Sequence, residues 1–219
     1  MKIQRYYHSC LLVTEGDAKI LFDPGSYSFM PGRAKPESFS GIDALFITHN
    51  HADHMLPDVI KTIVHNNSCK VYGNQEVAAA LREQGIEAEV LTHKQAVRIG
   101  DMTIEAFTAE HGPIPHANPQ NTAFIVNDRF LHPGDSLDPA LLAFPQMDVL
   151  ALPMGAPWMR LVDGLKFAKD MRPKKAIAIH DGIYQDAFNE SFAPRITTWL
   201  KEDGIEFFPL GTPEDSLEI

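Results

Sequence analysis

Short apolar runs alternate with turn residues and with longer amphipathic stretches along the chain. Residues 3–14 and 18–23 are rich in aliphatic and β-branched side chains, and the polar "EGD" between them is a turn signal, so the chain is predicted to begin with β-structure. Residues 24–41 are dense in Pro, Gly and Ser, which predicts a loop. After this loop, predicted strands and helices alternate.

The remaining elements come in two similar series. Strands are predicted at residues 42–48, 69–73, 88–91, 96–99, 102–109, 147–153, 174–180 and 205–210, with a hairpin over residues 122–132 that turns at Asn127 and Asp128. Helices are predicted at residues 56–67, 74–85, 160–171 and 191–204, the second with Asn74 as N-cap and Gly85 as stop. This order indicates two sheets packed together with helices outside. No linker or low-complexity tract separates the halves, so residues 1–219 are predicted to form a single domain.

Composition narrows the classes of function. Hydrophobic residues make up 44% of the chain, enough for a sizeable core, and acidic residues outnumber basic ones by 29 to 19, for a formal net charge of -10. This charge disfavours a sequence-independent nucleic-acid binder, which needs a basic face. Bound divalent metals would offset several charges locally, so a nucleic-acid substrate stays open as an alternative. A small-molecule substrate is the expected partner.

No segment has the pattern of a targeting or membrane element. The N-terminal "MKIQRYYHSC" lacks the apolar region of a signal peptide, and no apolar run approaches the ~20 residues of a membrane span. Cys10 and Cys69 lie in apolar stretches and form no CxxC, which is typical of reduced core thiols. A cytoplasmic protein with no membrane partner is therefore expected. The sequence leaves open whether it forms a homo-oligomer.

A cluster of potential metal ligands follows the predicted strand that ends at Thr48. His49, His51, Asp53 and His54 lie within "THNHADH". Side chains two positions apart point the same way in extended chain, so His49 and His51 are expected to converge on one point. Neutral imidazole and carboxylate suit zinc, manganese and iron. The alternative is a solvated polar loop, but the segment directly follows an apolar strand and has few ordinary surface residues.

Three further ligand-type residues occupy similar places. His111, Asp135 and His180 each lie at or just past the end of a predicted strand. Open α/β sheets bind ligands at the carboxyl ends of their strands. The sequence therefore predicts that these three side chains join the histidine-rich loop at one metal site.

These residues resemble the motifs of the metallo-β-lactamase superfamily. "HNHADH" is similar to its HxHxDH signature, the three downstream residues match its remaining ligands in type and order, and "ILFDPG" resembles the strand-turn before the signature. The resemblance implies an α+β fold, a four-layer αββα sandwich of two mixed β-sheets flanked by helices. "YYHSC" resembles an early motif of the ascorbate-6-phosphate lactonase-like branch. "MLPD" stands where glyoxalase II-like members have two glycines, which also favours that branch.

The resemblance also implies roles for the seven matching residues. The first metal would be held by His49, His51 and His111, the second by Asp53, His54 and His180, and Asp135 would bridge the two. Two divalent ions, zinc first and manganese or iron as alternatives, would share a hydroxide that attacks an ester, lactone, amide or phosphodiester. Asp53 and Asp135 would be the catalytic carboxylates. The chain is thus expected to be a metal-dependent hydrolase.

Other residues have roles that the sequence leaves open. His8 is expected near the site without being a primary ligand, and Asp23 either accepts a hydrogen bond from a ligating imidazole or only initiates a turn. His116 either faces the substrate or is a plain loop residue; it or His8 would donate a proton to the leaving group. His65, His93 and His132 are expected to be structural. The alternative functions are a non-catalytic metal-binding or sensing protein and a compact phosphodiesterase or nuclease.

Overall fold

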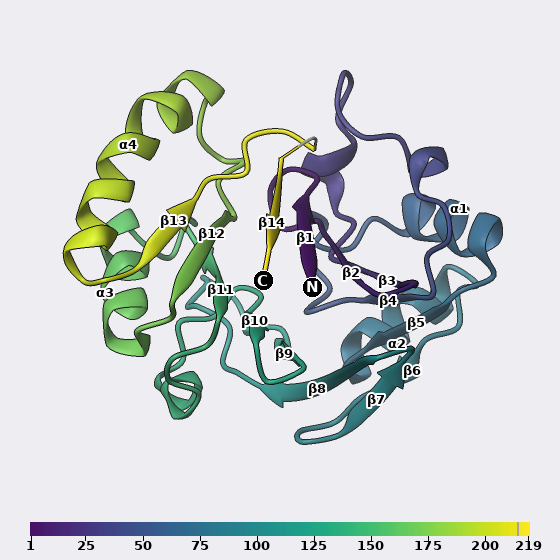
Figure 1. Ribbon diagram of the computed structural model, residues 1–219. Helices are drawn as coiled ribbons and strands as arrows, with labels where there is room; N and C mark the ends of the chain where they lie inside the picture. The colour runs from purple at the N-terminus through teal and green to yellow at the C-terminus, as the bar shows by residue number, and fades with distance from the viewer. Residues whose placement is uncertain (214) are drawn as a thin grey trace.

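Two seven-stranded sheets form the centre of the computed structural model, which describes residues 1–213 and 215–219 (Figure 1). The first sheet has the order β14-β1-β2-β3-β4-β5-β6, with bounds β1 Lys2–Arg5, β2 Leu11–Glu15, β3 Ala18–Phe22, β4 Ala44–Phe46, β5 Lys70–Gly73, β6 Glu89–Val90 and β14 Ser216–Glu218. The second has the order β13-β12-β11-β10-β9-β8-β7, with bounds β7 Ala96–Ile99, β8 Met102–Thr108, β9 Thr122–Val126, β10 Phe130–His132, β11 Val149–Pro153, β12 Lys175–Ile179 and β13 Glu206–Phe208. In each sheet the pairing is antiparallel at one side and parallel at the other, so both sheets are mixed.

Helices cover the outer face of each sheet. Figure 1 shows α1 (Pro57–Asn67) and α2 (Gln75–Glu83) outside the first sheet, and α3 (Leu161–Met171) and α4 (Asp186–Glu202) outside the second. One apolar cluster fills the space between the sheets, and one lies under each helical layer. The predicted αββα sandwich is therefore confirmed.

Aromatic side chains from both sheets interlock in the central cluster. Phe22, Phe46, Phe124 and Phe130 are completely buried, and the ring centroid of Phe22 lies 5.6 Å from that of Phe46 and 5.9 Å from that of Phe124. Tilted aromatic pairs at such separations add to the free energy gained by burying their area. Because Phe22 and Phe46 end β3 and β4, this packing fixes the strand ends from which the candidate site extends.

The Asn74 side chain links α2 to that edge. It caps the helix by accepting a hydrogen bond from the Val77 amide at 3.0 Å, as the sequence predicted. Its amide nitrogen also donates to the carbonyls of Thr48 at 3.0 Å and Gln120 at 2.9 Å. One side chain therefore terminates a helix and holds the strand end that precedes the histidine-rich loop.

The β-structure predicted over residues 3–14 is interrupted by a tight turn. β1 ends at Arg5 and β2 begins at Leu11. Between them, Tyr7 and His8 adopt left-handed backbone with φ of 64° and 48°, and the Tyr6 amide donates to the Cys10 carbonyl at 2.7 Å. The segment between the two strands contains no Gly, Pro or Asn, so its composition does not indicate a turn.

The C-terminal part differs from the prediction in two further places. The last helix begins at Asp186, five residues before the predicted start at residue 191, with Pro194 inside it. The extra turns bring Phe188 onto Phe192, whose ring centroid lies 4.5 Å away. The final strand β14 was not predicted; it pairs with β1 and not with its neighbours in sequence.

Cys10 and Cys69 are both buried and free. Burial raises the pKa of Cys69 to about 11 and that of Cys10 further. Within the described residues, no helix combines the length and apolar character that crossing a membrane requires.

Candidate metal centre

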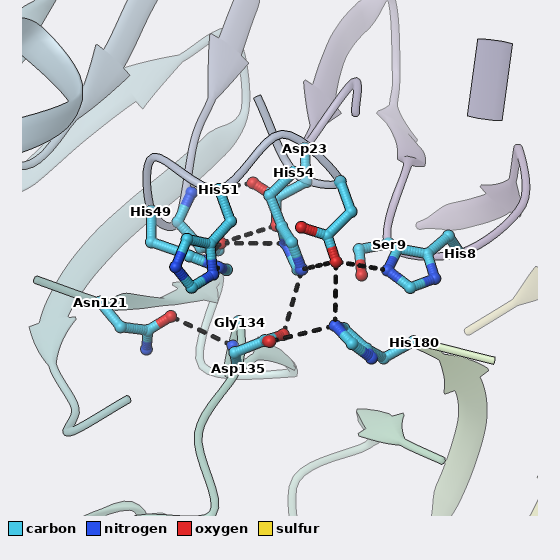
Figure 2. A network of polar contacts seen from close by, with 12 residues as sticks. His8, Ser9, Asp23, His49, His51, His54, Asn121, Gly134, Asp135 and His180 are labelled. Carbon is cyan, nitrogen blue, oxygen red and sulfur yellow. Dashed lines mark hydrogen bonds and ion pairs between the residues drawn. The ribbon is translucent and has the colours of Figure 1, made fainter. Parts of the chain in front are cut away.

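Ligand-type side chains from five strand ends meet at one edge between the two sheets (Figure 2). The loop after β4 supplies the HxHxDH residues, the chain just past β8, β10 and β12 supplies the downstream ones, and the turn after β1 supplies His8. They form two groups, in each of which the ligand atoms lie within 4.8 Å of one another: His49, His51, His111 and Asp135, and His8, Asp53, His54 and His180. All seven predicted ligands therefore come together, and His8 joins them.

Close backbone packing holds the HxHxDH loop in place. The Ser26 amide donates to the Ala52 carbonyl at 2.8 Å, and the Leu56 amide donates to the Pro24 carbonyl at 3.2 Å. Between these bonds a Cβ on Gly25 would lie 1.7 Å from the carbonyl oxygen of Asp53. Only glycine permits this approach. The turn after β3 thus sets the position of the loop that carries four of the ligand-type side chains.

The packing at Gly25 predicts a strong effect of one methyl group. Gly25→Ala forces two backbone segments apart, and we expect the free energy of unfolding to fall by about 3 kcal/mol, measured by urea denaturation. Gly211→Ala is the control, since its nearest atom would be Asp215 Oδ2 at 4.0 Å. Equal stability of the two variants would contradict the prediction.

Asp23 orients two of the candidate ligand histidines, His54 directly and His49 through Thr48. The Nδ1–H of His54 donates to Asp23 Oδ2 at 2.7 Å. His49 Nδ1 lies 3.0 Å from the Thr48 hydroxyl, which itself donates to Asp23 Oδ2 at 2.7 Å. The Thr48 amide donates to Asp23 Oδ1 at 2.8 Å, and the carboxylate is completely buried. Acceptors at Nδ1 fix the protons there and leave each Nε2 with a free lone pair.

His111 and His180 are oriented by glycine carbonyls. His111 Nδ1 donates to the Gly112 carbonyl at 2.6 Å, and His180 Nδ1 donates to the Gly155 carbonyl at 2.5 Å. An aromatic ring covers each glycine: a Cβ on Gly112 would lie 2.1 Å from the Trp158 ring, and one on Gly155 would lie 2.2 Å from the Tyr184 hydroxyl. The Nε2 atoms of both histidines therefore face the centre.

The donor set fits divalent metal ions. Among the described residues, the buried side-chain nitrogen and oxygen atoms without a hydrogen-bond partner include His54 Nε2, His111 Nε2, His180 Nε2 and Asp135 Oδ1. Buried polar groups nearly always have a partner, so four such atoms at one point indicate that a ligand supplies it. His51 Nδ1 lies 3.1 Å from His49 Nε2, so these two nitrogens converge as the strand period predicted.

Asp135 lies between the two groups. Its Oδ1 is 3.1 Å from His54 Nε2, and its Oδ2 is 3.0 Å from His180 Nε2 and 3.6 Å from His111 Nε2. The Asn121 side chain accepts a hydrogen bond from the Asp135 amide at 3.1 Å and donates to the Pro133 carbonyl at 3.0 Å. These two hydrogen bonds hold the buried Asp135 where its carboxylate reaches imidazoles of both groups.

The site attracts cations. Burial alone would lower the pKa of His180, but the carboxylates of Asp135 and Asp53 together outweigh it and raise that pKa to about 9. Burial would also lower the pKa of His54, but Asp135 and Asp23 together raise it well above its usual range. His180 and His54 in turn lower the pKa of Asp135 against the effect of burial. Without metal, protons on these imidazoles balance the buried carboxylates. Divalent cations would replace those protons.

The other predicted residues have different surroundings. His116 is exposed on the loop between β8 and β9 and belongs to neither group of ligand atoms found among the described residues. His132 is completely buried: its Nδ1 accepts from the Gly134 amide at 3.1 Å, and its Nε2 donates to the Ser9 carbonyl at 3.3 Å. His132 therefore braces two loops of the site.

Sequence reasoning missed the residues that hold the ligands. Thr48 contacts His49 Nδ1, and Asn121 accepts a hydrogen bond from the Asp135 amide, but neither had a predicted role; His132 was predicted to be structural. Thr48 directly precedes the HxHxDH signature, and this adjacency was the one signal that could have identified it.

Comparison with known proteins agrees with this geometry. The family described as "Beta-lactamase superfamily domain" matches residues 2–180 of this chain. Protein Rv0786c of Mycobacterium tuberculosis is 30% identical over 217 residues, covering 93% of this chain and 94% of its own. A UPF0173 metal-dependent hydrolase of Alkaliphilus metalliredigens is 28% identical over 221 residues, covering 90% of this chain and 94% of its own.

A solved structure shares the fold. The metallo-beta-lactamase fold protein YhfI from Bacillus subtilis superimposes with a TM-score of 0.69 at 15% identity, covering 99% of this chain and 98% of its own. The expected ascorbate-6-phosphate lactonase-like branch stays a prediction. The matched family, the sandwich and the gathered ligand residues agree, and this chain belongs to the beta-lactamase superfamily, with the metallo-β-lactamase fold.

Proposed function

We propose that this chain uses two divalent metal ions to hydrolyse an ester, lactone, amide or phosphodiester bond of a small molecule. That it is a metal-dependent hydrolase of the metallo-β-lactamase fold follows from its family and its His and Asp groups. The finer proposal is supported chiefly by one observation: buried imidazole and carboxylate atoms without hydrogen-bond partners converge from both ligand groups on one small volume.

Each group has the donors for one ion. His49, His51 and His111 would hold the first, Asp53, His54 and His180 the second, and Asp135 would contact both. Imidazole-rich sites of this type suit zinc, and manganese or iron have similar preferences. When bound, such a pair of ions polarises the bond under attack and makes water a nucleophile near neutral pH.

A carboxylate of the protein is suited to orient the attacking water. Asp53 is the more solvent-exposed of the two carboxylates, since its side chain is 24% exposed whereas that of Asp135 is 4% exposed. Burial would raise the pKa of Asp53, but hydrogen bonds with His180 and His8 outweigh it and lower the pKa below the usual range. Asp53 is therefore ionised at neutral pH and able to orient a water molecule. Of the other proposed ligands only His51 is also half-buried, and the rest are buried.

A panel of substrates tests the proposal. Metal is removed from the purified protein with a chelator and the residual metal is measured. The protein is then reloaded in turn with zinc, manganese and iron. Each form is then assayed with lactone, thioester, amide and phosphodiester substrates. We expect protein that binds two equivalents of metal to turn over at least one of these substrate classes. Binding without turnover of any class would favour a metal-binding or sensing protein, and turnover of phosphodiesters alone would favour a compact phosphodiesterase.

Removing metal should also lower thermal stability. A ligand that binds only the folded state at about a thousand times its Kd stabilises it by about 4 kcal/mol, which is roughly 10 °C in Tm for a chain of this size. We therefore expect chelation to lower Tm by that amount, measured by calorimetry, and re-addition of metal to restore it. The same Tm before and after chelation would contradict metal binding at this site.

A further inference from the structure

His8 differs from the other histidines of the centre in how its ring nitrogens are used. In His54, His111 and His180, Nδ1 donates to an oxygen and Nε2 lacks a hydrogen-bond partner. In His8, Nδ1 instead faces the backbone amide of Gly182 at 3.1 Å, and Nε2 lies 3.3 Å from Asp53 Oδ2. The position of His8 suggests a metal ligand, but its hydrogen bonds point to another role.

The Gly182 amide decides the tautomer of His8. A backbone N–H can only donate, so His8 Nδ1 must be the acceptor. The proton of the neutral ring then lies on Nε2, which is directed at the Asp53 carboxylate. A nitrogen that carries this proton has no lone pair for a cation.

We infer that His8 is a positioning residue that donates its Nε2–H to Asp53 Oδ2 and does not itself bind the second metal ion. This inference rests on the proposed two-ion site. Asp53 is the most exposed carboxylate there, and among the described residues its Oδ2 contacts the imidazoles of His8, His54 and His180. The hydrogen bond from His8 therefore restrains the more exposed of the two proposed carboxylate ligands, which solvent could otherwise draw away.

Several features of the fold keep His8 in this position. Left-handed backbone at Tyr7 and His8 turns the ring into the centre, a conformation that costs free energy and persists only where the surroundings enforce it. A Cβ on Gly182 would lie 2.8 Å from His8 Nδ1, so glycine lets the donating amide approach. The buried ion pair between Arg5 and Asp181, at 2.6 Å, joins the end of β1 to the residue before Gly182.

Two substitutions of His8 separate a donor from a ligand. Glutamine keeps an N–H at about the reach of Nε2 but is a poor ligand for zinc, whereas alanine removes both functions. Loss of a group that orients a ligand typically costs about 10- to 100-fold in metal affinity. We therefore expect His8→Ala to weaken the second zinc equivalent at least about tenfold in calorimetric titration, with the first unchanged, and His8→Gln to stay within a few-fold of wild type.

The outcomes distinguish the inference from the proposed function. If His8→Ala and His8→Gln lose the same affinity for the second zinc equivalent, His8 is a metal ligand and the inference is overturned. Wild-type affinity in both variants would also overturn it. If the wild-type protein is saturated by one equivalent of zinc, the proposed two-ion function is overturned instead. In that case nitrogen-15 NMR of metal-free protein at pH 7.5 still tests the tautomer: a proton on Nε2 of His8 is expected, and one on Nδ1 would overturn the inference.

Discussion

Asp135→Ala is expected to lower the rate of hydrolysis about a thousand-fold near neutral pH, equivalent to about 4 kcal/mol of transition-state stabilisation. The carboxylate lies within 3.6 Å of imidazoles in both ligand groups, so its loss removes a donor and a negative charge from between two cations. Repulsion between the ions then rises as their coordination falls. At least one ion should bind more weakly, as elemental analysis after dialysis will show.

The protein should stay folded in this variant, because Asp135 lies at the sheet edge and outside the apolar clusters. Asp58→Ala is the matched control: it removes an exposed carboxylate on α1, four residues after His54, and should keep both metals and the full rate. His132→Ala, three residues from Asp135, is a poorer control, since His132 is buried and braces Gly134. Two ions and near-normal turnover in Asp135→Ala would show that another residue bridges the groups.

Asp23→Ala is expected to weaken both the fold and the metal site. The carboxylate is completely buried and accepts hydrogen bonds from the Thr48 amide, the Thr48 hydroxyl and His54 Nδ1. Alanine leaves these donors without partners in the interior. We expect the free energy of unfolding of metal-free protein to fall by about 3 kcal/mol in urea, and metal affinity to fall about 10- to 100-fold because His54 loses its orientation.

Asp43→Ala serves as the control for Asp23. Asp43 also accepts a backbone hydrogen bond, from the Lys19 amide at 2.8 Å, but it is exposed. Its loss should cost no more than about 1 kcal/mol and leave metal binding unchanged. If Asp23→Ala binds metal as tightly as Asp43→Ala, then Asp23 does not orient His54 for coordination.

The architecture could be predicted where local pattern and packing agree. The strand Val149–Pro153 was recognisable because buried strands are nearly continuous apolar runs, and the hairpin of β9 and β10 because Asn127 and Asp128 mark its turn. Asn74 was recognisable because its side chain caps a helix locally. The turn at Tyr7 and His8 was not recognisable, since no glycine or asparagine indicates its left-handed backbone. β14 was missed because its partner lies at the other end of the chain.

The sequence by itself determined which residues can bind metal and in what order they occur. Histidine and carboxylate chemistry, the spacing of His49 and His51, and the position of His180 at a strand end are all local properties. Only the tertiary structure decided which ring nitrogen of each histidine faces the centre. That choice depends on the atom opposite the other nitrogen, such as Asp23 for His54 or the Gly182 amide for His8. These partners are separated from their histidines by 31 and 174 residues, so only folding brings them within hydrogen-bonding distance.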